Sequence, residues 1–255
     1  MLTSAKANQL LAALPEESCR QWFSELSAVE MRLGDVLHES GRTVNHVYFP
    51  TTSIVSLLYT LKDGASTEIA VVGNEGIVGI SALMGGNSTP NQSVVRSAGR
   101  GYRMPAAKLV SELEQDGPAA RLLLLYTQAL MTQISQIAAC NRHHSLDQRL
   151  CRFLLFSLDR LETQELWMTQ DLICNMLGVR REGVTEAAIA LQQAGLIRYQ
   201  RGHISVVDRP ALEARSCECY AVITKEYDRL LAREPAATPG IAAPDTRSAR
   251  WAPCP

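Results

Sequence analysis

The sequence predicts an α+β chain with an N-terminal β-roll of the jelly-roll type, a long central helix and a C-terminal winged helix-turn-helix. Residues 31–104 are short apolar runs separated by glycines, and residues 117–140 form an apolar helical seam without a breaker. Residues 168–208 combine two short helices around a glycine turn with a β-hairpin. At 255 residues the chain has room for two domains with cores of their own.

Composition narrows the function classes. The 25 basic residues are balanced by 26 acidic ones, so nucleic-acid binding has to come from a local surface rather than from an overall basic field. The 7 scattered cysteines do not resemble a secreted disulfide framework and favour a reducing compartment. We see no cleavable signal and no apolar run of about twenty residues. We therefore expect a cytoplasmic protein with no membrane partner.

Residues 1–116 are expected to form the β-roll domain together with N-terminal helices. Residues 5–30 carry an apolar helical stripe that Pro15 interrupts. From Met31 to about Met104, runs such as HVYFP and SIVSLLYTL lie between glycine turns, which is typical of a barrel or jelly roll. The glycine-rich segment GNEGIVGISALMGG lacks the lysine of a phosphate-binding loop and is interpreted as barrel turns.

Residues 117–144 are expected to form a dimerisation helix and a hinge. Two apolar faces on one helix suggest that one packs on the barrel and the other on a partner chain. Ser145 and Gln148 form a capping box that starts a new helix, which leaves residues 141–144 as the hinge. The first face comprises Leu123, Tyr126, Leu130, Gln133, Ile137 and Cys140, and the second comprises Leu124, Met131, Ile134 and Ala138.

Residues 145–234 are expected to form the winged helix domain with a C-terminal helix. Thr169 can cap the first helix, and Gly178 supplies the turn between the two helices. The apolar Val179 is expected to pack where the two helices meet. Gly195 ends the second helix. The positions of that helix that should face the core are Val184, Ala187, Ala188 and Leu191.

The wing and the end of the chain follow this helix. Residues 196–199 and 203–207 alternate enough to pair as a hairpin across Gln200, Arg201 and Gly202. Beyond the wing, residues 210–232 are expected to form one more amphipathic helical stretch. Residues 235–255, rich in Ala and Pro, are expected to be a disordered tail.

The outward face of the second helix is polar and includes Arg181, Glu182, Thr185 and Glu186. A helix fits the DNA major groove, where Arg can bond guanine and Glu can accept from the cytosine amino group. This favours Arg181 and Glu182 as base readers. The alternative is an ordinary solvated helix face, which the composite motif of two helices and a wing argues against.

The order of β-roll, long helix, hinge and winged helix resembles the Crp/Fnr family of bacterial transcription regulators over residues 10–208. The motif LGVRREGV is similar to the family's G-x-S-R-E-T-V, and AGLI with its hairpin matches the approach to the wing. The resemblance implies a cyclic-nucleotide-binding-like domain, a homodimer on palindromic double-stranded DNA, and RNA polymerase as a partner.

The resemblance places the family's base-contacting Arg and Glu on Arg181 and Glu182 and its phosphate-contacting Thr on Thr169. Arg180 stands where the family usually has a capping Ser, and Glu186 stands where its best-known members have a third base-reading Arg. We therefore expect a half-site that differs from the usual one. The predicted DNA-binding residues are Thr169, Gln170, Arg180, Arg181, Glu182, Thr185, Glu186 and Arg201.

The β-roll departs from the family's cyclic-AMP pattern. Where that branch has Gly-Glu and Arg-Ser, this chain has Gly79-Ile80 and Asn91-Gln92, so a cyclic phosphate would lack its counter-charge. A gap in the alignment would instead place Arg96 there. With Cys19 as the only N-terminal cysteine, an iron–sulfur switch of the family type is also excluded. The effector is therefore unknown, and its predicted pocket comprises Gly79, Ile80, Asn91, Gln92, Arg96 and Ser135.

No cofactor and no metal are expected. Haem or metal binding through Cys140, His143 and His144 is conceivable, but adjacent histidines point to different helix faces, so these are interpreted as hinge residues. Cys217 and Cys219 can bind metal or oxidise, yet no further ligands lie nearby in sequence, so packing is favoured.

Three alternatives to an effector-controlled regulator stay open. The barrel could be a scaffold of a constitutive regulator, or it could be a small-molecule or redox sensor that acts through protein contacts, with a degenerate helix-turn-helix. A cupin-like enzyme would need a metal at His38, Glu39 and His46, whose spacing is weak support. No catalytic triad, paired carboxylates or dinucleotide motif indicates an enzyme.

Overall fold

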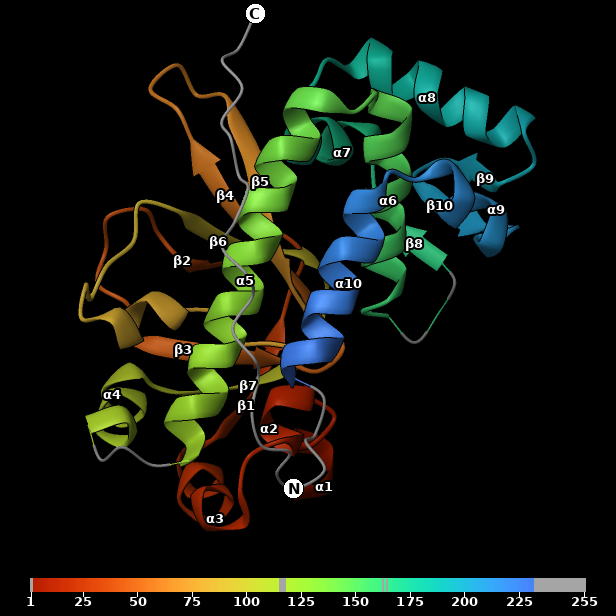
Figure 1. The fold of residues 1–255 in the computed structure, drawn as a ribbon. Coiled ribbons are helices and arrows are strands. Elements are labelled where there is room, and N and C mark those ends of the chain that lie inside the picture. Colours follow the sequence, from red (N-terminus) through yellow and green to blue (C-terminus); the bar gives the residue numbers. More distant parts are fainter. Residues whose placement is uncertain (1, 115–117, 162, 164, 232–255) are drawn as a thin grey trace, which may run out of the picture.

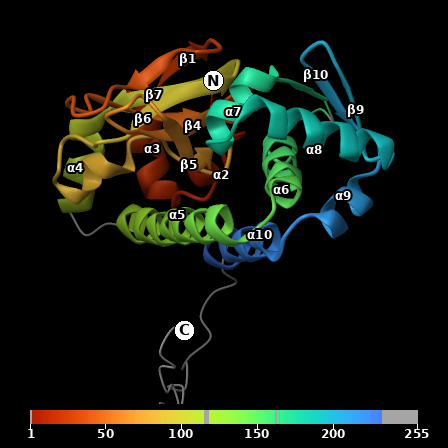
Figure 2. The ribbon, with the colours of Figure 1, turned by 90° about the horizontal axis from the view of Figure 1, so that it is seen from above.

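The computed structural model describes residues 2–114, 118–161, 163 and 165–231. A β-roll and a winged helix domain lie side by side, and α5 (Pro118–His143) runs along the β-roll (Figure 1). Figure 2 shows α5 and α10 (Glu218–Leu231) together along one edge of the molecule. The expected disordered tail, residues 235–255, and the expected domain boundary at residues 116–117 lie outside the described residues.

The β-roll consists of two antiparallel sheets, as predicted. One sheet has the strand order β2-β6-β4-β5 and the other the order β1-β7-β3, and apolar side chains from both fill a common core. The strands, all within described residues, are β1 (Ser27–Met31), β2 (Val36–His38), β3 (His46–Pro50), β4 (Ile54–Thr60), β5 (Ser66–Val72), β6 (Gln92–Ser97) and β7 (Gly99–Pro105).

The N-terminal segment is helical, but for a shorter stretch than expected. The helices are α1 (Leu2–Ala5), α2 (Gln9–Ala12) and α3 (Glu16–Glu25), and Pro15 precedes α3 at its N-cap position. The prediction of helix as far as residue 30 is wrong, because β1 pairs with β7 from Ser27 opposite Arg103 to Met31 opposite Gly99. This non-local pairing overrides the helical periodicity.

Two short helices of the β-roll region, one between β5 and β6 and one between β7 and α5, were not predicted. A short 3-10 helix, η1 (Ile80–Met84), follows Gly79 within the segment interpreted as barrel turns. Helix α4 (Ala106–Glu114) follows β7 directly, and its Ala106 and Leu109 are buried in the β-roll core.

Helix α5 buries its first apolar face, as predicted. Every member of that face, from Leu123 to Cys140, is at most 5% exposed. On the second face, Leu124 and Met131 are 67% and 61% exposed. Burial of the first face is therefore confirmed, with its larger part packed on the β-roll and its C-terminal end, at Cys140, packed on the segment at the start of α10. Contact of the second face with a partner chain stays a prediction.

The hinge is shorter than predicted. Helix α5 continues through His143, and the next helix, α6 (Leu146–Leu158), begins after Ser145. The break is thus His144–Ser145 rather than residues 141–144, because nothing in the side chains before His144 interrupts the helical hydrogen bonds. The capping box is confirmed: the Gln148 N–H donates to Ser145 Oγ at 3.3 Å, and the Ser145 N–H donates to Gln148 Oε1 at 3.2 Å.

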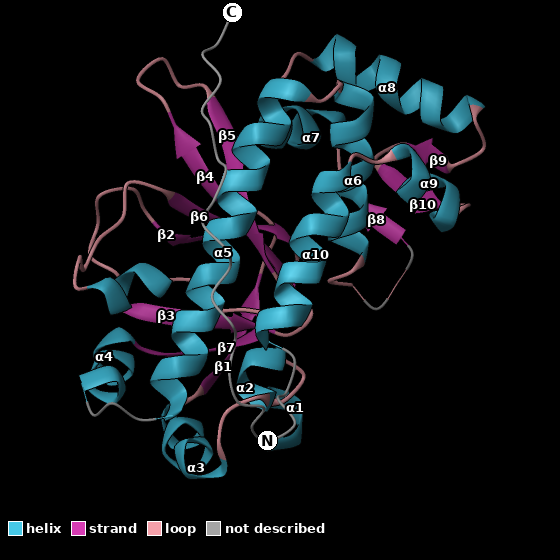
Figure 3. Ribbon diagram, in the orientation of Figure 1, coloured by secondary structure: helices cyan, strands magenta, loops and turns pink. Residues whose placement is uncertain are grey.

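The winged helix is also confirmed. Gly178 caps the first helix with φ +62° and is followed by Val179, which is half-buried against the domain core. A short strand that the sequence did not predict completes a sheet of order β8-β10-β9. The elements, shown by type in Figure 3, are β8 (Glu165–Trp167), α7 (Gln170–Leu177), α8 (Arg181–Gln193), β9 (Ile197–Gln200) and β10 (His203–Val206).

Two details of the C-terminal region correct the prediction. Gln200 pairs with His203, so the wing turn is the two-residue Arg201-Gly202, with φ of +52° and +80°. The expected single helical stretch after the wing is two helices, α9 (Arg209–Arg215) and α10, because the backbone is extended at Ser216 (φ −67°, ψ 161°). The break allows α10 to turn back along α5 (Figure 2).

The winged helix domain is docked on the β-roll. Helix α7 packs against β5, where a Cβ atom at Gly178 would lie 3.2 Å from Thr67 Oγ1. Leu58 of β4 belongs to the apolar core of the winged helix domain. Among the described residues, no helix has the length and apolar character needed to cross a bilayer.

Candidate DNA-binding surface

The surface begins at the N-terminus of α7, where the predicted cap is present. Thr169 Oγ1 accepts a hydrogen bond of 3.2 Å from the Leu172 N–H, and the Thr169 side chain stays on the exposed surface. The next residue, Gln170, is half-buried and faces α8. Its Oε1 atom accepts hydrogen bonds from Thr185 Oγ1 at 3.2 Å and from Arg181 Nε at 3.4 Å.

Arg181 opens α8 and projects into solvent. Its guanidinium is 65% exposed and lies 3.4 Å from a carboxylate oxygen of Asp171, which is 70% exposed. Such an exposed ion pair contributes only about 0–1 kcal/mol, so Arg181 can leave Asp171 for a base edge at little cost. Arg180, at the N-cap position, is exposed and makes no side-chain cap hydrogen bond.

The wing is held against the start of α7. Tyr199 donates from its hydroxyl to the Met168 carbonyl at 3.1 Å, and the Tyr199 N–H donates to Gln192 Oε1 at 2.8 Å. Burial raises the pKa of Tyr199, so its hydroxyl stays a neutral donor. The tight turn then places Arg201 at the exposed tip of the wing.

These elements surround one hollow of about 370 Å³. The predicted residues Thr169, Gln170, Arg181 and Arg201 line it together. Arg180 directly precedes Arg181 in the sequence. The Thr185 hydroxyl donates a hydrogen bond to Gln170, which lines the hollow. Glu182 and Glu186 are exposed on α8, away from the hollow's lining. The structure therefore gathers the predicted DNA-binding residues on α7, α8 and the wing.

The inner face of α8 is buried as predicted, with Val184, Ala187, Ala188 and Leu191 at most 8% exposed. Sequence reasoning missed Ile189, which is 50% exposed on the outer side. Ile189 lies seven positions after Glu182 and three positions after Glu186, so the helical periodicity that places those residues on the outer face could also have identified Ile189. An exposed apolar side chain here is suited to contact a thymine methyl group.

The predicted effector residues fall on different parts of the structure. Ile80 is 7% exposed within the β-roll core, and Gly79 precedes it with φ +99°. Asn91 Oδ1 accepts from Thr89 Oγ1 at 2.8 Å. Gln92 Nε2 donates to Glu39 Oε2 at 2.8 Å, which places an acidic group beside it.

Ser135, the α5 member of that predicted pocket, lies on the exposed face of the helix. It lines a shallow hollow of about 460 Å³ with Leu124 and Met131. Leu124 and Met131 are the exposed members of the second apolar face of α5. Ser135 is thus separated from the residues of the β-roll with which it was grouped.

Arg96 is completely buried between the two domains. Its Nη1 donates to Glu68 Oε2 of β5 at 2.7 Å, and its Nη2 donates to Ser157 Oγ of α6 at 2.9 Å. Ser56 also donates to the Glu68 carboxylate. Burial lowers the pKa of Arg96, and the charge of Glu68 opposes that effect. This guanidinium is engaged by protein groups rather than directed at a ligand.

The candidate cupin-like metal site does not form a cluster. His38 Nε2 lies 2.7 Å from the backbone carbonyl of His46 rather than beside its ring. Within the described part of the chain, the one group of three or more His, Cys, Asp or Glu side chains placed to share an ion is Cys140, His144, Cys217 and Cys219. Sequence reasoning had assigned these residues separately to the hinge and to packing.

Two family models match the chain. Residues 28–116 match the cyclic nucleotide-binding domain, and residues 148–215 match the Crp-like helix-turn-helix domain. The two matches coincide with the β-roll and the winged helix described above. A search of curated protein sequences found no match.

Solved structures share this fold over about three quarters of the chain. FixK2 from Bradyrhizobium japonicum has a TM-score of 0.66 and 19% identity, over 75% of this chain and 98% of its own. A CRP-family transcriptional regulator from Thermus thermophilus has a TM-score of 0.61 and 19% identity, over 74% and 96%. The c-di-GMP-responsive regulator CLP from Xanthomonas campestris has a TM-score of 0.61 and 14% identity, over 76% and 100%. At these identities the likeness establishes the shared fold.

Proposed function

The chain belongs to the Crp/Fnr family of DNA-binding transcription regulators, and from this membership we propose that it acts as a homodimer on a palindromic operator under control of a signal at the β-roll. The observation that carries the proposal is the convergence of Thr169, Gln170, Arg181 and Arg201 around one hollow at the exposed end of α8. A helix end and a wing presented together suit the major groove and the adjacent phosphates.

Each reading residue has a distinct role in this proposal. Arg181 donates to guanine O6 and N7, and Glu182 accepts from the cytosine amino group. Thr169 and Arg201 contact phosphates and set the register without reading sequence. Glu186, exposed on the next turn of α8, cannot donate to guanine, so the half-site has a cytosine or no fixed base where an Arg would select guanine.

Dimerisation would use the second face of α5. Leu124 and Met131 lie seven positions apart, so they share one side of the helix and are both largely exposed. Pairing this face with its copy would remove apolar surface from water and place two α8 helices about one DNA turn apart. Because the chain is nearly neutral overall, two sets of phosphate contacts would provide the affinity.

The signal would reach the DNA-binding domain through the docked interface. Contacts at Gly178 and Thr67, and the Arg96–Ser157 hydrogen bond, join β5 and β6 to α7 and α6. A ligand that favours one arrangement of this interface would bias the position of α8. We propose an effector other than cyclic AMP, since Ile80 is apolar and Arg96 is neutralised by Glu68. We also propose that the protein contacts RNA polymerase, that it is cytoplasmic and that it catalyses no reaction.

The test is selection of duplexes from random DNA by the purified full chain at fixed, near-physiological salt. Arg181→Ala is run in parallel, with Arg20→Ala, an exposed arginine on α3, as the charge-matched control. We expect a palindrome that Arg20→Ala retains and Arg181→Ala loses. A palindrome that Arg181→Ala still selects with the same bases would contradict the assigned reading residue.

A second candidate is a constitutive regulator whose β-roll is only a scaffold, favoured by the engagement of Arg96 with protein groups. It predicts an enriched palindrome without any added ligand and no shift in melting temperature with nucleotides. A nucleotide that raises the melting temperature would exclude this candidate, because only a ligand bound to the folded state stabilises it.

A further inference from the structure

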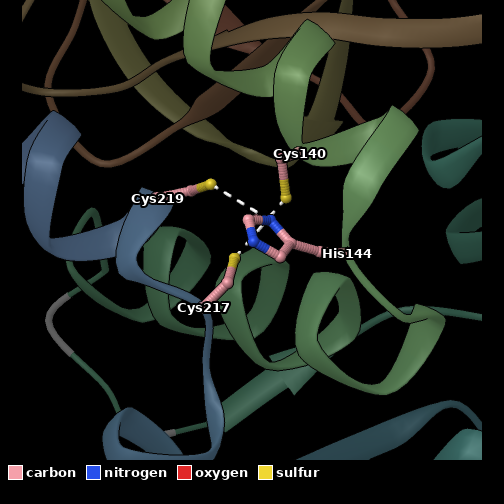
Figure 4. Close-up of side chains that lie close together, drawn as sticks. All are labelled: Cys140, His144, Cys217 and Cys219. Atoms are coloured by element: carbon pink, nitrogen blue, oxygen red, sulfur yellow. Dashed lines mark hydrogen bonds between the residues drawn. The ribbon is translucent and has the colours of Figure 1, made fainter. Parts of the chain in front are cut away.

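Side chains from two distant parts of the sequence meet where α5 ends and α10 begins. Figure 4 shows Cys140, His144, Cys217 and Cys219 directed toward one another. Their three Sγ atoms and the ring nitrogen of His144 all lie within 4.8 Å of one another. Cys140, Cys217 and Cys219 are at most 4% exposed, and together they form a small core cluster of their own. The group lies outside the DNA-binding surface.

Local structure directs each of these side chains inward. Cys140 and His144 are one helical turn apart, and the His144 N–H donates to the Cys140 carbonyl at 3.0 Å, so both project from one face. Cys217 precedes α10, and Cys219 lies in its first turn. The neighbouring turn of α5 adds Gln136, whose Nε2 donates to Cys219 Sγ at 3.3 Å.

We propose that Cys140, His144, Cys217 and Cys219 form a tetrahedral site for a zinc ion. The Cys140 and Cys217 sulfurs are 3.5 Å apart, and Cys219 Sγ is 3.4 Å from His144 Nδ1. Zinc bonds of about 2.3 Å to sulfur and 2.0–2.1 Å to nitrogen, at tetrahedral angles, give ligand separations of about 3.8 Å and 3.5 Å. These two separations are within a few tenths of an ångström of the tetrahedral values, and the remaining pairs, all within 4.8 Å, would close by at most about 1 Å around the ion. Three sulfurs and one imidazole are the donor set that zinc prefers in closed sites.

The surroundings also suit a metal ligand set. His144 presents its second ring nitrogen, Nε2, to Glu218 Oε1 at 3.3 Å, which leaves Nδ1 directed at the cysteine sulfurs. A carboxylate on the far side of a metal-bound imidazole fixes the ring and raises its basicity. Cys217 and Cys219 stand at the N-terminus of a 14-residue helix, where the backbone dipole favours thiolates.

Electrostatics favour an anionic centre here. Zinc with three thiolates and a neutral imidazole carries one negative charge. The charge of Arg152, a residue only 4% exposed, acts on Cys140 and would offset it.

The close spacing distinguishes this site from other uses of cysteine. Ligand atoms within 4.8 Å of one another leave room for a single ion and not for a multi-iron cluster, whose thiolates bind different irons. A disulfide between Cys140 and Cys217 would leave Cys219 and the His144–Glu218 pair unexplained. A bound ion would instead tie the end of the central helix to the segment that follows the wing.

The first test measures metal in the full-length protein, purified in reductant without chelator. We expect about one zinc per chain, as for closed structural sites. Cys217→Ser and His144→Gln should each reduce zinc to background. Cys19→Ser, which changes a half-buried cysteine of α3 outside the cluster, is the matched control and should keep the full amount.

The second test adds cobalt(II) to chelator-treated protein and does not depend on zinc acquired in the cell. We expect the visible bands of tetrahedral cobalt and an intense near-ultraviolet thiolate band at one equivalent, and a higher melting temperature. Glu218→Gln, which keeps all four ligands, should weaken metal affinity about 10- to 100-fold. This variant keeps the proposal testable if the ligand variants fold poorly by circular dichroism.

Three outcomes would overturn the proposal. The first is wild-type protein with neither stoichiometric zinc nor cobalt bands, and the second is a Cys217→Ser variant that retains the metal. The third is a Cys140–Cys217 disulfide in metal-free protein that binds no cobalt after the disulfide is reduced. None of these measurements involves DNA. The proposed metal site can therefore be refuted while the proposed regulator function is supported, and the regulator function can be refuted while the metal site is supported.

Discussion

Arg96 of the β-roll donates a hydrogen bond of 2.9 Å to Ser157 of α6, across the junction between the two domains. The same guanidinium pairs with Glu68 at 2.7 Å and lies over the Phe153 ring, 4.5 Å from its centre. All of these groups are nearly or completely buried. The guanidinium therefore joins β5 and β6 of the β-roll to the first helix of the winged helix domain.

Arg96→Met is expected to lower the free energy of unfolding by about 3–5 kcal/mol, because it leaves the Glu68 carboxylate buried without its partner. Ser157→Ala removes only the link to α6 and should cost about 1.5–3 kcal/mol. Urea unfolding of both variants measures the difference, with Arg20→Ala as the surface control, expected within about 0.5 kcal/mol of wild type. Equal losses in the two variants would show that the Glu68 pair is not the main support.

Arg181→Ala should weaken binding to the selected operator by about 1–3 kcal/mol and relax the base preference at one position of each half-site. Arg201→Ala, at the wing tip, should weaken binding to all sequences alike and reduce the salt slope by about 1. Fluorescence anisotropy at several salt concentrations separates the two effects. A uniform loss in Arg181→Ala would place that side chain on a phosphate instead.

Leu124→Glu combined with Met131→Glu should convert a dimer to a monomer, since the paired α5 faces would bury four carboxylates without partners. Sedimentation velocity gives the mass of each form. Leu61→Glu is the matched control, because Leu61 is 59% exposed, close to the 61% of Met131, but lies outside α5. A double variant that stays dimeric would mean that the dimer uses another surface.

His38 should make the protein less stable in mild acid. Burial is the main cause that lowers its pKa below the usual 6.5 of an unfolded histidine. Above pH 6.5 both states hold a neutral ring, whereas below it the unfolded state takes up the proton first, so stability falls with pH until the folded pKa is reached. One such group contributes a slope of at most about 1.4 kcal/mol per pH unit.

The comparison for this prediction is wild type against His38→Gln, which keeps a donor for the His46 carbonyl. Urea midpoints at pH 7.5 and 5.5 are measured for both proteins. The wild type should lose more stability between the two values than the variant does. Parallel losses would show that His38 titrates alike in the folded and unfolded chains.

Features that depend on neighbouring residues were predictable from the sequence alone. Thr169 and Ser145 cap their helices, and Gly178 makes the turn between α7 and α8, as expected. The buried faces of α5 and α8 also match their periodicities. Capping and helix periodicity depend on contacts within about four positions, so a single segment contains the whole signal. The predicted DNA-binding surface depends largely on these two helices and the wing that follows.

Contacts between distant segments were decided only by the tertiary structure. Residues 27–30 look helical in sequence but belong to β1 because β7 supplies their hydrogen bonds, and β8 forms because β10 lies beside it. Cys140 and Cys217 are 77 positions apart and meet only because α10 turns back along α5. From the sequence alone, Cys140 was interpreted as a hinge residue and the Cys217 and Cys219 pair as packing. Which segments become neighbours depends on the burial of apolar surface over the whole chain, and no local pattern contains that information.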